Sequence, residues 1–163
     1  MDPRIDALKQ QIADAFADVP YPGDDRLVDD PFDWEAADLL ACFKGRHWKA
    51  LTHEDLFQNS LTFVGLDAYS FYLPAYLLAA LDDYEHSDHV VYGLCPTTDD
   101  PKLLEWDLRR FDRLNARQRA AVRSFLEYMR DQTHRFAATR KDIEEALAGY
   151  WAPKDPSDGG RPT

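Results

Sequence analysis

The chain has 163 residues, a formal net charge of −11 and a hydrophobic content of 45%, including 13% aromatic residues. This apolar content excludes an intrinsically disordered chain, and seven glycines and ten prolines are too few for a collagen-like or low-complexity segment. The length corresponds to a single domain with its own hydrophobic core.

The first residues lack the apolar core of a secretory signal, and no run approaches the ~18 apolar residues of a membrane span. The only cysteines, Cys42 and Cys95, are too far apart in sequence for a zinc-knuckle spacing and indicate reduced thiols. We therefore expect a cytoplasmic protein that does not bind a membrane.

The charge is distributed unevenly along the chain. Residues 1–100 contain 20 acidic and six basic side chains, for a charge of −14. Residues 101–163 contain ten acidic and 13 basic side chains, for a charge of +3. The negative overall charge disfavours direct binding to nucleic acid. Two interpretations remain: the arginines pair within the fold, or the acidic half docks a basic partner.

Apolar residues at helical spacing predict a first helix over 3–17, with Pro3 in its first turn. The following segment, 18–33, contains three prolines, one glycine and six aspartates, which is typical of a loop. We expect four apolar side chains to anchor this loop to the core: Tyr21, Leu27, Val28 and Phe32.

Capping residues predict the next two helices. Asp33 is a plausible N-cap for a helix over 34–43, which Gly45 ends, and Thr52 opens a short helix that runs through Gln58. The most apolar stretch, 66–81, is hydrophobic on every face, which indicates a central buried helix. We expect Asp67 to cap it and Pro74 to produce a kink or a new start.

The second half of the chain predicts four more helical segments. A short helix within 82–102 ends before Pro96. Asn115 is a clear N-cap for the helix 116–133, which has the strongest amphipathic pattern of the chain. The last 12 residues have no apolar anchor and predict a flexible tail over 152–163. The other predicted helices span 102–112, 116–133 and 141–151.

Together these elements predict an all-α fold: one domain over 1–151, with six to seven helices around the kinked helix 66–81. We expect the helix 116–133 to be the main packing partner of that central helix. Tyr69, Tyr72 and Tyr76 fill the core with satisfied hydroxyls, or they line a pocket; the sequence favours the core.

Sequence motifs for catalysis are absent. The chain has no G-x-S-x-G elbow, Walker loop, G-x-G-x-x-G or H-E-x-x-H motif, so we expect a non-enzymatic protein without a cofactor. One cluster offers metal-ligand chemistry, since Glu85, His86 and His89 carry zinc donors and the two histidines share a face if the segment is helical. A matching second pair is missing, and a solvated polar loop is the alternative.

Six residues are candidates for partner binding. The acidic loop supplies Asp24, Asp25, Asp29 and Asp30, and the block F-K-G-R-H-W supplies Arg46 and Trp48. This block concentrates basic and aromatic residues in an otherwise acidic half. It also fits the end of a helix, where basic residues complement the dipole and Gly45 adopts a left-handed conformation. The sequence leaves both interpretations open.

Five blocks occur in an order that is found elsewhere: I-A-D-A-F-A-D-V-P-Y-P-G-D (12–24), F-K-G-R-H-W-K-A-L (43–51), L-F-x-N-S-L-T-F (56–63), A-Y-S-F-Y-L-P-A-Y-L-L-A-A-L (68–81) and L-N-A-R-Q-R-A-A-V-R-S-F-L-E-Y-M (114–129). This order resembles a group of small bacterial proteins that share a domain of unknown function. The chain departs from it at 64–67 and 115–117, where a Thr-Pro-Glu helix start is expected. The resemblance implies a bacterial cytosolic protein and no particular reaction.

The sequence therefore favours an acidic protein-interaction module that masks a basic protein, in the manner of an immunity protein or antitoxin. One alternative is a structural subunit of a larger assembly. The other is a metal-dependent enzyme that uses His86 and His89. The sequence determines neither the partner nor the oligomeric state.

Overall fold

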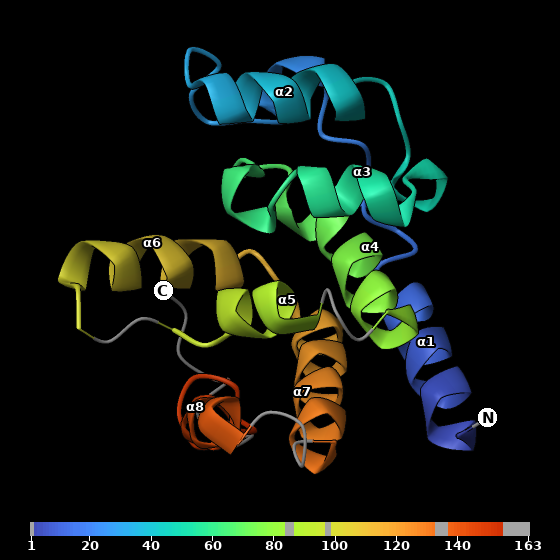
Figure 1. The fold of residues 1–163 in the computed structure, drawn as a ribbon, viewed down its shortest axis with the longest axis vertical. Coiled ribbons are helices and arrows are strands. Elements are labelled where there is room, and N and C mark those ends of the chain that lie inside the picture. The colour runs from blue at the N-terminus through green and yellow to red at the C-terminus, as the bar shows by residue number, and fades with distance from the viewer. Residues whose placement is uncertain (1, 84–86, 97–98, 133–136, 155–163) are drawn as a thin grey trace.

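The computed structural model describes residues 2–83, 87–96, 99–132 and 137–154. Within these ranges the chain forms eight α-helices and three short 3₁₀ helices, and no strand, which confirms the all-α prediction (Figure 1). In chain order they are α1 (Pro3–Ala15), η1 (Asp24–Arg26), α2 (Trp34–Phe43), η2 (Trp48–Ala50), α3 (His53–Gln58), η3 (Leu61–Phe63), α4 (Tyr69–Asp82), α5 (Ser87–Leu94), α6 (Pro101–Phe111), α7 (Ala116–Asp131) and α8 (Ala137–Ala148).

Helix α4 forms the centre of the core, as its apolar sequence predicts, and ten of its 14 residues are buried. Its main helical neighbours are α1 and α5, whereas α7 packs against α1 and α8. The prediction that α7 is the main partner of α4 was therefore wrong. Periodicity identifies the face that a helix buries, here Val122, Phe125 and Leu126 on α7, but not the element that covers this face.

The start of α4 also differs from the prediction. The helix begins at Tyr69 after Ala68, which provides no side-chain cap, and it continues through Pro74 without a new start. Asp67 instead forms an ion pair with Arg113, whose Nη1 lies 3.1 Å from Oδ1. Asp67 precedes the first helical residue by two positions. It lies in a turn in which the Ala68 N–H donates a hydrogen bond to the Gly65 carbonyl.

Most of the other predicted helix starts are confirmed; the exception is the last helix, predicted over 141–151, which spans Ala137–Ala148 as α8. Asp33 accepts hydrogen bonds from the backbone of α2, and complete capping boxes join Thr52 to Asp55 and Asn115 to Gln118. Gly45 follows α2 with a φ of 70°, the left-handed conformation that terminates a helix. Within the described ranges, none of the helices has the length and apolar character needed to cross a bilayer.

Candidate functional site

The four aspartates predicted for partner binding differ in their local roles. Asp24 and Asp25 open the exposed turn η1. Asp29 accepts a hydrogen bond from the Leu66 N–H at 2.9 Å, and Asp30 accepts one from the Phe32 N–H at 2.9 Å. Asp29 therefore joins the loop to the segment before α4, although all four aspartates are exposed on the surface.

Arg46 and Trp48 are integrated into the end of α2 and the turn that follows. Trp48 is only 5% exposed. The Nη2 of Arg46 lies 2.9 Å from the Asp55 carboxylate and 2.8 Å from the Ala50 carbonyl, and its Nη1 donates to the Cys42 carbonyl. The structure thus gives both side chains a role within the fold and places Trp34, not Trp48, on the surface of this region.

The two most exposed aromatic residues of the acidic half lie at the start of α2. Phe32 is 95% exposed and Trp34 is 72% exposed. The prediction that Phe32 anchors the loop was wrong, because its side chain is exposed, whereas Leu27 and Val28 are buried as predicted. We define the α2 patch as the exposed residues Asp30, Phe32, Trp34, Glu35 and Asp38.

The α2 patch places two exposed aromatic rings beside three exposed carboxylates. Large aromatic side chains cost free energy when they remain in water, and Trp is enriched among the residues that dominate binding at interfaces. Trp34 and Asp38 are four residues apart and so share one face of α2. Figure 1 shows α2 at one end of the long axis of the molecule, where a partner can approach it.

The predicted metal cluster is only partly described. Glu85 and His86 lie outside the described residues, and His89 is exposed on α5. Among the residues that the structure does describe, no three His, Cys, Asp or Glu side chains are grouped so as to hold a metal ion.

Arginines of the C-terminal third form ion pairs close to their own helices. Arg119 pairs with Asp112 at 3.3 Å, and Arg123 pairs with Glu127 at 3.1 Å one turn along α7. These contacts agree with the interpretation that local pairing compensates part of the positive charge.

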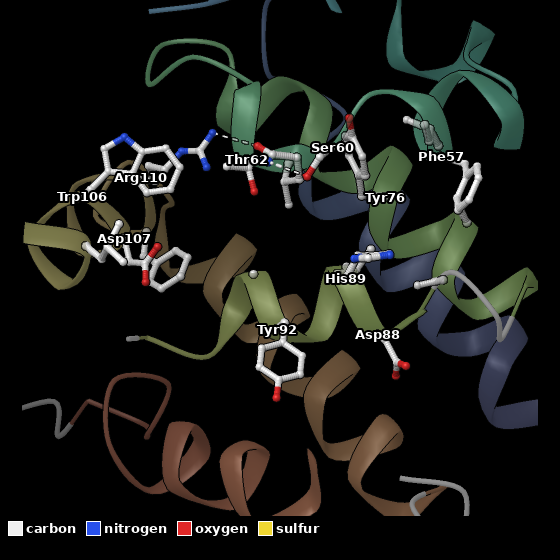
Figure 2. Close-up of a pocket in the computed structure, with 18 of the residues that line it drawn as sticks. Phe57, Ser60, Thr62, Tyr76, Asp88, His89, Tyr92, Trp106, Asp107 and Arg110 are labelled. Carbon is white, nitrogen blue, oxygen red and sulfur yellow. Dashed lines mark hydrogen bonds between the residues drawn. The ribbon is translucent and has the colours of Figure 1, made fainter. Parts of the chain in front are cut away.

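A pocket of about 660 Å³ opens between α3, η3, α5 and α6, with α4 behind it. Figure 2 shows Trp106 and Arg110 at one end and Phe57 at the other, with Thr62 on one side and His89 facing Tyr76. Its lining includes three exposed apolar side chains, Phe57, Tyr92 and Leu103. Tyr76 is buried in the core and also lines the pocket. Both roles that the sequence allowed, filling the core and lining a pocket, therefore apply to this tyrosine.

Arg110 is the buried charged residue of this pocket, with 3% of its surface exposed. Its Cζ lies 4.2 Å from the ring centroid of Trp106 and 4.5 Å from that of Tyr69, so aromatic rings contact the guanidinium. Its Nη2 donates to the carbonyls of Leu61, at 3.0 Å, and Val64. Burial lowers the pKa of Arg110 from its ordinary value, since a low-dielectric surrounding disfavours the charged form.

Sequence reasoning did not single out Arg110, because arginine side chains are seldom fully buried. The helical pattern of α6 predicts Leu104, Leu108 and Phe111 as the inner face, and only Phe111 is fully buried. Trp106 and Arg110 are four residues apart in α6, so the ring and the guanidinium lie on one face of the helix. This spacing is the sequence feature that could have indicated their contact.

The comparisons with known proteins give one result. A family model described as "Family of unknown function (DUF6714)" matches residues 4–155. No curated protein and no solved structure matches the chain significantly. The matched range covers most of the chain, which therefore belongs to the DUF6714 family, whose function is unknown.

Proposed function

We propose that this protein is a non-enzymatic interaction module that binds a basic protein through the α2 patch, as an immunity protein or antitoxin masks its target. The observation that carries this proposal is the exposure of Phe32 and Trp34 within an acidic surface. The aromatic rings supply apolar area that becomes buried on binding, and the carboxylates select a positively charged partner.

The charge of the chain supports the same partner chemistry. Residues 1–100 carry a formal charge of −14, and this half contains the α2 patch. Complementary charges accelerate association and reject partners of the same sign, and both effects weaken as salt increases. A basic partner therefore has to bind faster at low salt than at high salt.

The test begins with a photo-crosslinking amino acid at position 32, introduced into the full chain and irradiated in a lysate of the source organism. A second protein with the crosslinker at position 92 on α5 is the matched control, because Tyr92 is exposed on a different element. A captured protein supports the proposal only if it is basic and is absent from the control. Crosslinking to a second copy of this chain would favour the structural-subunit alternative and overturn the masking role.

The purified partner then allows a quantitative comparison of three variants. Joint replacement of Phe32 and Trp34 by Ala should weaken binding by at least about 30-fold, since hot-spot residues contribute about 2 kcal/mol or more. Replacement of Asp30, Glu35 and Asp38 by their amides should slow association and reduce its salt dependence. The charge-matched control replaces Asp6, Asp99 and Glu105 by their amides, because these residues are exposed on other parts of the surface. Equal effects of the two charge variants on association would contradict the α2 patch as the binding site.

A further inference from the structure

The pocket beside α6 is separate from the α2 patch and has the properties of a site for a small molecule. Its volume of about 660 Å³ lies within the range of about 300–1,000 Å³ that is usual for ligand pockets. Five elements line it, and most of the lining side chains are apolar, including Leu56, Leu61 and Val90. Such a lining favours a ligand with an apolar body.

The polar group at one end of the pocket determines which ligand it favours. Arg110 retains its positive charge at neutral pH, because arginine does not deprotonate in proteins. Its hydrogen bonds within the described part of the chain reach carbonyl oxygens, which satisfy donors without neutralising the charge. In the same described part its Nε is buried and has no hydrogen-bond partner. A buried cation with a free donor is stabilised when an anion reaches it.

The surroundings of Arg110 limit the size and charge of that anion. Trp106 and Tyr69 contact the guanidinium, which leaves its edge as the place where an acceptor can bind. Asp107 also lines the pocket and opposes a second negative charge. Figure 2 shows Asp88 on the side of α5 opposite His89, at the end of the pocket away from Arg110. A single carboxylate with a hydrocarbon body fits these conditions.

We propose that the pocket binds a small amphipathic monocarboxylate, with its apolar body between η3 and α5 and its carboxylate at the guanidinium edge of Arg110. The exposed side chains of Phe57 and Leu103 then cover the part of the hydrocarbon body nearest solvent. This site is independent of the interface proposed above, because it involves none of the residues of the α2 patch.

The structure offers a matched pair of variants that tests the pocket without altering Arg110. Gly93 lies exposed in α5 and lines the pocket, and a Cβ at this position would meet only Cδ2 of Leu61, at 4.0 Å. Gly93→Ala is therefore accommodated, whereas Gly93→Leu fills the space between α5 and η3. Circular dichroism and thermal unfolding establish that both variants remain folded.

The experiment titrates the full chain with dodecanoate below its micelle concentration and follows the indole N–H resonance of Trp106 by NMR. The resonance is assigned with the variant Trp106→Phe. Dodecyltrimethylammonium, which has the same hydrocarbon chain and the opposite charge, is the control ligand. We expect saturable shifts with dodecanoate, at least tenfold weaker binding of the cation, and at least tenfold weaker dodecanoate binding in Gly93→Leu but not in Gly93→Ala.

Three results would overturn the proposal. If the cation binds as tightly as dodecanoate, the pocket does not select a carboxylate. If Gly93→Leu binds dodecanoate as tightly as Gly93→Ala, the ligand lies elsewhere. If dodecanoate leaves the Trp106 resonance unchanged, the Arg110 end of the pocket does not take part.

Discussion

The carboxylate of Asp29 accepts a hydrogen bond from the backbone N–H of Leu66, 37 residues further along the chain, at 2.9 Å. Beside it, the Gly65 N–H donates to the Leu27 carbonyl at 2.8 Å. These two contacts hold the acidic loop against the turn that leads into α4. Both Asp25 and Asp29 are exposed, but the hydrogen bond to Leu66 lets Asp29 contribute to the fold.

Replacement of Asp29 by Ala should lower the free energy of unfolding by about 1–2 kcal/mol, because the Leu66 N–H loses a charged acceptor. Replacement of the exposed Asp25 by Ala should change it by less than about 0.5 kcal/mol. Urea unfolding of both variants measures the difference. Equal stability of the two variants would show that the Asp29 contact does not hold the loop.

Gly65 and Gly93 should respond in opposite ways to replacement by Ala. A Cβ at Gly65 would lie 3.0 Å from the Cα and carbonyl carbon of Val28, so the backbone must move, at a cost of about 1–3 kcal/mol. A Cβ at Gly93 has space, and Ala stabilises a helix relative to Gly by about 0.5–1 kcal/mol. Thermal unfolding compares the two variants, and a tolerated Gly65→Ala would contradict the close approach of the two segments.

Tyr69 and Tyr76 form a second contrasting pair on one helix. The Tyr69 hydroxyl is buried without a hydrogen-bond partner in the described residues, whereas the Tyr76 hydroxyl donates to the Asn59 carbonyl. Tyr69→Phe removes an unsatisfied polar group and should raise the free energy of unfolding by about 1 kcal/mol. Tyr76→Phe should lower it by about 1 kcal/mol. Chemical unfolding checks both signs, and a loss of stability in Tyr69→Phe would contradict the unsatisfied hydroxyl.

Asp55 should make the stability of the protein depend on pH. The hydrogen bond from the Thr52 backbone N–H is the largest of the contributions that lower its pKa, from 3.8 to about 2, and Arg46 adds to the effect. The contribution of Asp55 is complete above pH ~4 and is lost as the pH falls towards 2, because the folded state then has to bind a proton at an unfavourable site.

Asp55→Asn tests this dependence. At pH 7 the variant should be less stable than the wild type by about 1 kcal/mol, since the amide loses the charge that Arg46 faces while it can still accept from Thr52. The difference should decrease as the pH is lowered from 4 to 2. Urea unfolding across this range gives the result, with Asp99→Asn as the exposed control. A difference that stays constant with pH would exclude a lowered pKa of Asp55.

Local interactions explain why the sequence predicted most helix starts correctly. Asp33, Thr52 and Asn115 bond to backbone groups no more than three residues away, so the signal and its effect lie in one short segment. The same reasoning predicted the end of α2 at Gly45, because only the conformation of the glycine itself is involved. The failed cap at Asp67 is informative, since that side chain pairs with Arg113, far away in sequence.

The sequence by itself determined the helical class, most helix starts and the buried face of α7, because periodicity and capping depend on near neighbours in the chain. Tertiary structure alone decided that Arg110 and Trp48 are buried and that Phe32 is exposed. It also placed α1 against both α4 and α7. These outcomes depend on which surfaces meet after the chain folds. The residues that cover a buried side chain can lie far away in sequence, so its burial does not follow from its near neighbours.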